Sequence, residues 1–314
     1  MNESLIWIIV FVVSLGALLQ SSHFFTKSAD TIGVYFGVPE FIVGVTIIAV
    51  GTSLPELVSS IFAVVSGNSE IVVGNVVGSN ITNICLIVGL SAVMGKRLTT
   101  TYDLAQVDLP LLLGSALLIS FMIWDGKFGR IEAVICLVGI GIYMFYAVGV
   151  ERKVYEGEEG SAPRPKLGWK TPLVLVLSAI ALYFSAKYTV RSIVRISEIF
   201  SIAKETIAVT AVSLGTSLPE LAVSIMAARN GKPGLAIGNV LGSNIFNSFA
   251  VMGIPALFGT ILIPRGMLEF AVPLMLAVTI LFVFMSQDKV LTRWDGWLFL
   301  LFYCFFIGAV LHLI

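Results

Sequence analysis

The chain contains two copies of one segment, and this duplication limits its possible folds more than any other feature. Residues 44–93 align with residues 208–257 without a gap, at a constant offset of 164 positions, and 23 of the 50 aligned residues are identical. The heptapeptide GTSLPEL occurs in both copies, at 51–57 and 215–221, and each copy continues with GNV and GSNI. Such similarity indicates an ancestral duplication, so both halves of the chain should adopt the same fold.

Apolar segments recur along the whole length of the chain. Of its 314 residues, 57% are hydrophobic and 12% are charged, whereas soluble domains contain about 25% charged residues. We therefore expect a polytopic membrane protein whose main surroundings are the lipid bilayer, with no obligatory protein partner evident. The formal net charge of zero argues against nucleic acid as a partner. The expected spans are roughly 5–26, 39–66, 70–95, 105–124, 129–150, 171–195, 204–229, 234–260, 268–286 and 296–313.

A charged stretch rich in glycine and proline separates the first five spans from the last five. We divide the chain into a first repeat at 1–150, a hydrophilic linker at 151–170 and a second repeat at 171–314. Because each repeat has an odd number of spans, the second repeat enters the membrane from the opposite side. The predicted fold is all-α, with ten transmembrane helices arranged as two inverted five-helix repeats.

The distribution of Lys and Arg orients this arrangement in the membrane. With the N-terminus outside, the inner loops hold 12 Lys and Arg residues and the outer loops hold 7. Positive residues are enriched in cytoplasmic loops. We therefore expect a multi-pass protein of the cell membrane, with its N-terminus outside and its linker inside.

A proline lies within the second and seventh spans, in the duplicated heptapeptide. Proline lacks an N–H and clashes with the carbonyl four residues earlier, which is that of Gly51 for Pro55 and that of Gly215 for Pro219. We expect helices two and seven to be broken into half-helices joined by a short non-helical stretch. Exposed carbonyls are tolerated at membrane depth only where they line a cavity or meet a partner.

A glutamate follows each proline, so Glu56 and Glu220 lie near the middle of their spans. An ionised carboxylate at this depth costs at least a few kcal/mol. Spans two, three, seven and eight contain no Lys or Arg at this depth. Bound protons or bound metal ions must therefore neutralise the two glutamates.

Oxygen donors accompany the glutamates in both repeats, and no His or Cys joins them. Carboxylate, hydroxyl and amide oxygens favour Ca²⁺, Na⁺ or K⁺ over Zn²⁺ or Cu⁺. Two carboxylates match one Ca²⁺, two Na⁺ or two protons, which is the equivalence that an antiporter requires. The donors are Thr52, Ser53, Ser79 and Asn83 in the first repeat, and Thr216, Ser217, Ser243 and Asn247 in the second.

Glycines recur four residues apart in spans three and eight, at 74 and 78 and at 238 and 242. Small residues at this spacing allow helices to approach closely. We expect spans three and eight to press against the proline-containing helices and to present their serine and asparagine side chains to the ion site.

The motif pairs GTSLPE with GNVVGSNITN, and GTSLPE with GNVLGSNIFN, resemble the two α-repeats of the sodium/calcium exchanger family within the cation/Ca²⁺ antiporters. The resemblance implies that Glu56 and Glu220 are the central Ca²⁺ ligands, together with the carbonyls of Thr52 and Thr216. It further implies Na⁺ sites at Ser53 with Ser243 and at Ser217 with Ser79, backbone ligands at Ala49 and Ser213, and Asn83 and Asn247 in the middle of the site.

The predicted function is secondary active antiport, in which Ca²⁺ is exchanged for Na⁺ by alternating access. We expect no enzymatic activity and no cofactor beyond the transported ions. A Ca²⁺/H⁺ antiporter of the same superfamily shares the two glutamates and remains an alternative, and a passive cation channel is a more distant one. Some K⁺-dependent relatives carry Asp where this chain has Asn247, so support for K⁺ co-transport is weaker.

Overall fold

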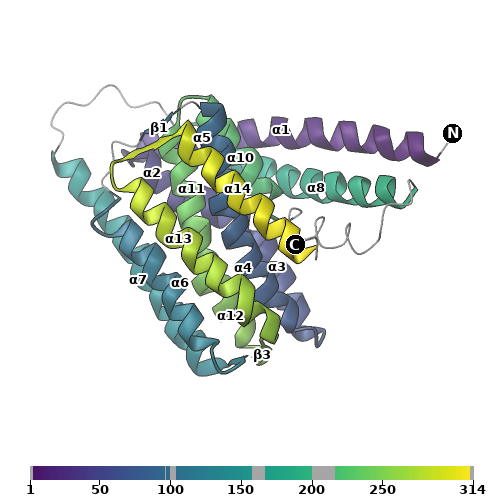
Figure 1. Ribbon diagram of the computed structural model, residues 1–314. Coiled ribbons are helices and arrows are strands. Elements are labelled where there is room, and N and C mark those ends of the chain that lie inside the picture. Colours follow the sequence, from purple (N-terminus) through teal and green to yellow (C-terminus); the bar gives the residue numbers. More distant parts are fainter. Residues whose placement is uncertain (1–2, 96, 100–103, 158–166, 200–215, 312–314) are drawn as a thin grey trace.

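The computed structural model describes residues 3–95, 97–99, 104–157, 167–199 and 216–311. The first half comprises α1 (Glu3–Phe36), α2 (Glu40–Val43), the π-helix η1 (Gly44–Ile48), α3 (Ala49–Val65), α4 (Glu70–Thr82), the π-helix η2 (Asn83–Val88), α5 (Gly89–Gly95), β1 (Arg97–Thr99), α6 (Asp108–Met122), β2 (Lys127–Phe128) and α7 (Arg130–Gly157) (Figure 1).

The second half is built from the corresponding elements. It comprises α8 (Lys170–Ile199), α10 (Leu218–Arg229), α11 (Pro233–Phe246), the π-helix η3 (Asn247–Val251), α12 (Met252–Ala256), β3 (Ile261–Leu262), the π-helix η4 (Met267–Ala271), α13 (Val272–Ser286), β4 (Val290–Thr292) and α14 (Arg293–Val310).

The all-α polytopic fold predicted from the sequence is confirmed. Within the described residues, eight continuous helices are long and apolar enough to cross a membrane. The apolar helix α6 is shorter and corresponds to the fourth predicted span, whereas α10 is the second part of the seventh. The predicted span 204–229 begins outside the described residues. Helix α1 extends ten residues beyond its predicted end, from residue 26 to Phe36.

Two small antiparallel sheets reveal the relation between the repeats. Strand β1 pairs with β4, and strand β2 pairs with β3. The 164-residue offset relates residue 97 in β1 to residue 261 in β3, and residue 127 in β2 to residue 291 in β4. The internal symmetry therefore exchanges one sheet for the other. Strands β1 and β3 lie at opposite ends of the bundle (Figure 1), so this symmetry also exchanges the two ends, as inverted repeats require.

Helices α1 and α8 are the first helices of the two repeats, and they pack side by side in opposite directions. The Thr189 hydroxyl donates a hydrogen bond to the Ser14 hydroxyl at 3.0 Å. Nearer the start of α1 and the end of α8, the Arg191 guanidinium lies 5.8 Å from the centre of the Trp7 ring. This pair projects from the remaining helices (Figure 1). Its antiparallel packing is a second sign of inversion.

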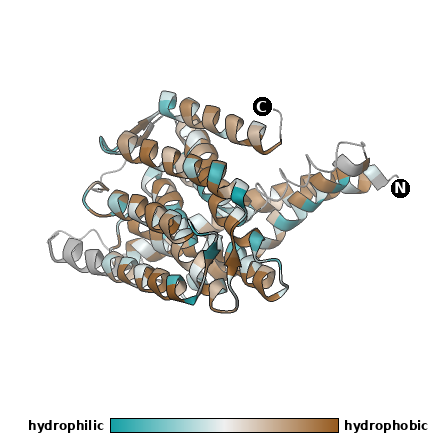
Figure 2. Cartoon of the chain, turned by 60° about the horizontal axis from the view of Figure 1, so that its bottom comes forward, coloured by the Kyte–Doolittle hydropathy of each residue, from teal (hydrophilic) through white to brown (hydrophobic). Residues whose placement is uncertain are grey.

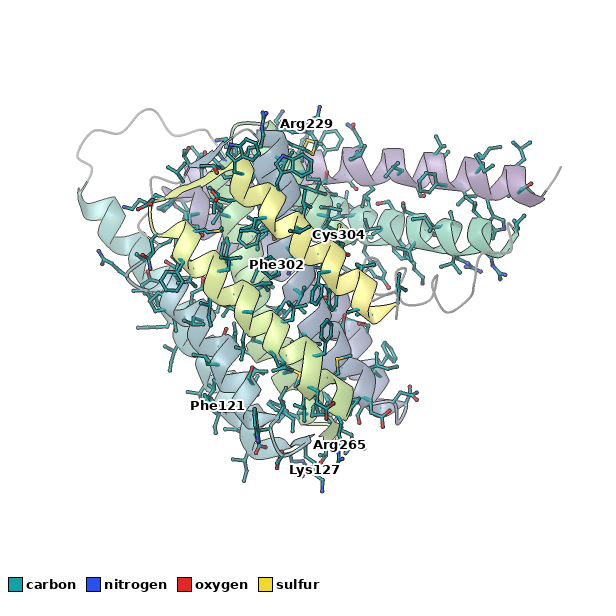
Figure 3. All side chains as sticks on the ribbon, in the orientation of Figure 1. Phe121, Lys127, Arg229, Arg265, Phe302 and Cys304 are labelled. Atoms are coloured by element: carbon teal, nitrogen blue, oxygen red, sulfur yellow. The ribbon has the colours of Figure 1, made fainter. Side chains whose placement is uncertain are left out.

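Hydrophobic residues cover most of the helical surface in Figure 2, which suits contact with lipid. Cationic side chains mark the two ends of the bundle. Figure 3 places Arg229 at one end and Lys127 and Arg265 at the other. The helices of the bundle other than α1 and α8 therefore run between two polar ends, as in an integral multi-pass membrane protein.

Helix α11 lies at the centre of the bundle. Within the span Pro233–Ala256, the most apolar stretch of 18 residues is entirely buried. Two glycines make this possible, because a methyl group at Gly238 would overlap the carbonyl oxygen of Phe41, and one at Gly242 would lie 2.5 Å from that of Val45. The predicted close approach is thus confirmed for the second repeat, where α11 packs against α2, η1 and α3.

The expected break in helix two is wrong in its form and position. The chain remains helical from Glu40 to Val65, with Pro55 inside α3, and departs from α geometry in the π-turn η1 upstream of the heptapeptide. Proline removes a single N–H, and a long helix packed along both sides of the proline can lose one hydrogen bond and remain helical.

The second copy of the heptapeptide has a different geometry. Helix α10 begins at Leu218, and Pro219 lies in its first turn, where a missing N–H removes no helical hydrogen bond. A helix therefore starts within the seventh span, while residues 200–215 before it lie outside the described part. The motif therefore lies inside a helix in the first repeat, whereas in the second repeat a helix begins within it, at Leu218.

The packing of α11 predicts a sharp difference between two glycine substitutions. Gly238→Val should destabilise the protein by about 1–3 kcal/mol or more, because the neighbouring atoms are backbone and cannot move aside. Gly114→Ala is the control, since no described atom outside its own helix lies within 4 Å. Thermal unfolding in detergent measures both, and equal stability of the two variants would contradict this packing.

Candidate ion-binding site

Glu56 and Glu220 are both buried, each with 1% of its surface exposed, where α3 and α10 meet. The Ser53 hydroxyl lies one turn before Glu56 on α3 and donates a hydrogen bond to Oε1 of Glu220 at 3.0 Å. A side chain of the first repeat thus holds the carboxylate of the second. The two glutamates predicted from the sequence therefore lie in one region between the repeats.

Two asparagines of the GNV motifs hold the glutamate backbones in place. The Asn75 side-chain nitrogen donates to the carbonyl of Glu56 at 3.3 Å and to the Ser60 hydroxyl at 3.1 Å. In the second repeat, Asn239 makes the equivalent bonds, to the carbonyl of Glu220 at 3.4 Å and to the Ser224 hydroxyl at 2.8 Å.

The oxygens of the same asparagines bind across the repeat boundary. The Thr52 hydroxyl lies 3.2 Å from Oδ1 of Asn239, and the Thr216 hydroxyl lies 3.4 Å from Oδ1 of Asn75. Asn75 and Asn239 are not among the residues predicted from the sequence, although they recur at the 164-residue offset.

The predicted serines lie around this region. The hydroxyls of Ser79 and Ser217 are 3.4 Å apart, so the pair implied by the family resemblance is brought together. On the other side, the Cβ of Ala49 lies 2.8 Å from the position that a Cβ would take at Gly242, immediately before Ser243. Ser243 is fully buried.

Asn83 and Asn247 each begin a π-turn. The turns η2 and η3 start at these residues, so both repeats depart from α geometry at the same motif position. Such bulges are frequent at functional sites. The Asn83 nitrogen donates to Oδ1 of Asn244 at 2.9 Å, and the Asn247 nitrogen donates to Oδ1 of Asn80 at 3.3 Å.

Five buried oxygens in this region have no hydrogen-bond partner among the described residues. They are Oε2 of Glu56 and of Glu220, Oδ1 of Asn83 and of Asn247, and Oγ of Ser243. A buried oxygen without a partner is costly, so each of these atoms calls for a water, an ion or a proton as its partner. Four of these five are carboxylate or amide oxygens, which can donate no hydrogen bond unless the acid is protonated. The set therefore suits a cation or a proton.

Thr52 and Ser213 are two further ligands predicted from the sequence. The Thr52 hydroxyl also lies within hydrogen-bonding distance of carbonyls in its own helix, at 3.1 Å from Ile48 and 3.3 Å from Ala49. A hydroxyl that donates to a carbonyl keeps its lone pairs, so both the hydroxyl and the carbonyl of Thr52 remain candidate ligands. Ser213 lies outside the described residues.

Lys232 is engaged at the edge of the bundle, away from the glutamates. Its ammonium lies 2.8 Å from Oε1 of Glu40 and 3.2 Å from Oδ1 of Asp30. Burial lowers the pKa of Lys232, but the hydrogen bonds to Glu40 and Asp30 outweigh burial, and the net effect is a raised pKa. These two ion pairs tie the residue before α11 to α1 and to the start of α2, and they leave the charge of the glutamates uncompensated.

The cross-repeat bonds of Asn239 predict its contribution to stability. Asn239→Leu removes the partners of Thr52, Ser224 and the carbonyl of Glu220. It should destabilise the protein by about 1–3 kcal/mol. Ser224→Ala removes one of these bonds and should cost clearly less. Thermal unfolding of both purified variants provides the measurement, and an Asn239→Leu protein as stable as Ser224→Ala would show that the bond across the repeats contributes nothing.

A doubly acidic, oxygen-lined region between two inverted repeats is the architecture of a secondary transporter. The chain belongs to the sodium/calcium exchanger protein family, whose model matches residues 6–150 and 170–311. This confirms the resemblance of the α-repeat motifs, and the family is one of transporters.

The chain is similar to known membrane proteins over most of its length. It is 33% identical to the sodium/calcium exchanger MaX1 of Methanosarcina acetivorans, over 97% of this chain and 98% of that protein. It is 31% identical to the inner membrane protein YrbG of Escherichia coli, over 79% of this chain and 78% of that protein. A solved structure of the sodium-calcium exchanger NCX_Mj, soaked with Na⁺ and Ca²⁺, superposes with a TM-score of 0.84 at 28% identity, covering 97% of this chain and 98% of that one.

Proposed function

We propose that the protein exchanges Ca²⁺ for Na⁺ across the cell membrane by alternating access. The observation that carries this proposal is the meeting of Glu56 and Glu220 in one buried region, each with a carboxylate oxygen that lacks a partner among the described residues. The names of MaX1 and NCX_Mj, both sodium/calcium exchangers, support the same pair of ions.

The charge of the site supports exchange rather than simple binding. With both glutamates ionised, the site carries two negative charges, and burial makes any uncompensated charge costly. One Ca²⁺ neutralises the site, and so do two Na⁺. The site can therefore change the side of the membrane that it faces with either ion bound. Without an ion, the two buried negative charges make the same change energetically costly. Ca²⁺ would bind the two carboxylates together with the carbonyls of Thr52 and Thr216, and Na⁺ would use the surrounding hydroxyl and amide oxygens.

The inverted repeats supply a reason for alternating access. A site between two structurally equivalent halves can face either side of the membrane when one half moves relative to the other. The excess of Lys and Arg in the loops on one side supports an N-terminus outside. Under this orientation the linker and the end of the bundle near Arg229 face the cytoplasm.

The two carboxylates should be indispensable for transport. Glu56→Gln and Glu220→Gln each retain the shape of the side chain but remove half of the negative charge. Each should therefore abolish ⁴⁵Ca²⁺ uptake into vesicles that contain the purified protein. Glu269→Gln, at an exposed position on η4, is the matched control and should transport normally. Near-normal uptake by either buried variant would refute the proposed site.

The coupling ion can be identified in the same vesicles. An outward Na⁺ gradient should drive Ca²⁺ uptake, and a pH gradient alone should not. Ser79→Ala and Ser217→Ala should raise the Na⁺ concentration needed for half-maximal exchange more than the Ca²⁺ concentration, because a neutral hydroxyl ligand matters more to a monovalent ion than to Ca²⁺ held by two carboxylates. Uptake driven by pH and insensitive to Na⁺ would instead establish Ca²⁺/H⁺ antiport.

A further inference from the structure

We infer that Asn80 and Asn244 are positioning residues for ion selectivity, which turn the amides of Asn247 and Asn83 so that their oxygens, and not their nitrogens, face the ions. Neither Asn80 nor Asn244 is one of the ligands considered above. The inference rests on the proposed function, because it concerns the orientation of two of the ligands assigned there.

The orientation of Asn80 is fixed by a backbone carbonyl. A carbonyl oxygen can only accept a hydrogen bond. The side-chain nitrogen of Asn80 lies 3.5 Å from the carbonyl of Asn244 and 3.1 Å from the Ser248 hydroxyl. If the amide were turned over, its oxygen would face the carbonyl of Asn244, and two acceptors would be left in contact. Oδ1 of Asn80 must therefore point to the other side.

The orientation of Asn247 follows from that of Asn80. Oδ1 of Asn80 accepts a hydrogen bond from the side-chain nitrogen of Asn247 at 3.3 Å. With its nitrogen committed there, Asn247 must direct Oδ1 away from Asn80. This oxygen is one of the buried oxygens for which the described part of the chain offers no partner. A chain of two hydrogen bonds thus leads from a backbone carbonyl to an oxygen available to a cation.

Asn244 and Asn83 form the equivalent pair of hydrogen bonds, with the two repeats exchanged. Asn244 donates to the carbonyl of Asn80 at 3.3 Å, and its Oδ1 accepts from Asn83 at 2.9 Å. Oδ1 of Asn83 is then left without a described partner. Residues 80 and 244 are separated by the repeat offset of 164, so each repeat fixes the amide that the other repeat presents.

This arrangement also disfavours a carboxylate at position 247. An ionised Asp in place of Asn247 would set a second acceptor oxygen against Oδ1 of Asn80. Asn80 cannot turn to donate without facing the carbonyl of Asn244. The network therefore selects a neutral donor at this position, either an amide or a protonated acid, and keeps the charge of the site at that of the two glutamates.

A double-mutant cycle tests whether Asn80 acts through Asn247. The variants are Asn80→Ala, Asn247→Ala and the double variant, compared with the unchanged protein in vesicles. The quantity measured is the ratio of the half-saturating Ca²⁺ concentration to the Na⁺ concentration that halves Ca²⁺ uptake. Asn80→Ala should change this ratio about three- to tenfold, in the same direction as Asn247→Ala. In the Asn247→Ala background, it should produce no further change.

Ser248→Ala is the matched control, because it removes a partner of the Asn80 nitrogen and leaves Oδ1 in place. It should lower thermal stability slightly and leave the ratio unchanged. The symmetry-related cycle of Asn244→Ala with Asn83→Ala independently tests whether an asparagine orients the amide of the other repeat. If Asn80→Ala does not fold, this second cycle tests the inference in its place.

Additive effects of Asn80→Ala and Asn247→Ala would overturn the inference, since they would show that Asn80 has only a structural role. An unchanged ratio in Asn247→Ala would overturn it as well, because the oriented oxygen would then be irrelevant to the ions. Neither result bears on the glutamates, whose charge-neutral variants test the proposed exchange separately.

Discussion

The rest of the structure depends on two carboxylates that are buried in an apolar protein. In the described part of the chain, no cationic side chain lies beside them. Spans two, three, seven and eight bring no Lys or Arg to their depth. Lys232, at the edge of the bundle, is engaged by Asp30 and Glu40. An isolated buried charge is too costly to persist. The fold gathers oxygen donors from both repeats around the two carboxylates, and a cation or a proton can then neutralise their charge.

Neither repeat builds this region alone, because its hydrogen bonds cross between the halves. Ser53 holds Glu220, Thr52 meets Asn239, and Asn83 meets Asn244. The halves also contribute one strand each to both small sheets and pack their first helices together. The two copies consequently form one folded unit. Its internal symmetry relates the candidate ligands in pairs, which suits the proposed exchange between the two sides of a membrane.

The symmetry is nevertheless incomplete where the heptapeptide lies. Pro55 is inside a continuous helix, whereas Pro219 lies in the first turn of α10. A proline in a first turn removes no backbone hydrogen bond, so the helix start in the second repeat has a local cause. In the first repeat, α3 continues through Pro55 and packs against α11. Identical sequence thus gives different backbone geometry in different surroundings.

The sequence by itself determined the number and extent of most spans, the duplication and, through the odd number of spans per repeat, the inversion. It also singled out Glu56 and Glu220, because an ionised carboxylate in an apolar span is costly unless a partner neutralises it. These properties follow from composition and order along the chain. The tertiary structure alone decided which oxygens remain free, since that depends on contacts between residues more than 130 positions apart, such as Ser79 with Ser217. It also revealed Asn75 and Asn239, and the continuity of the helix through Pro55, because hydrogen bonds and packing across the repeats outweigh what a local motif can specify.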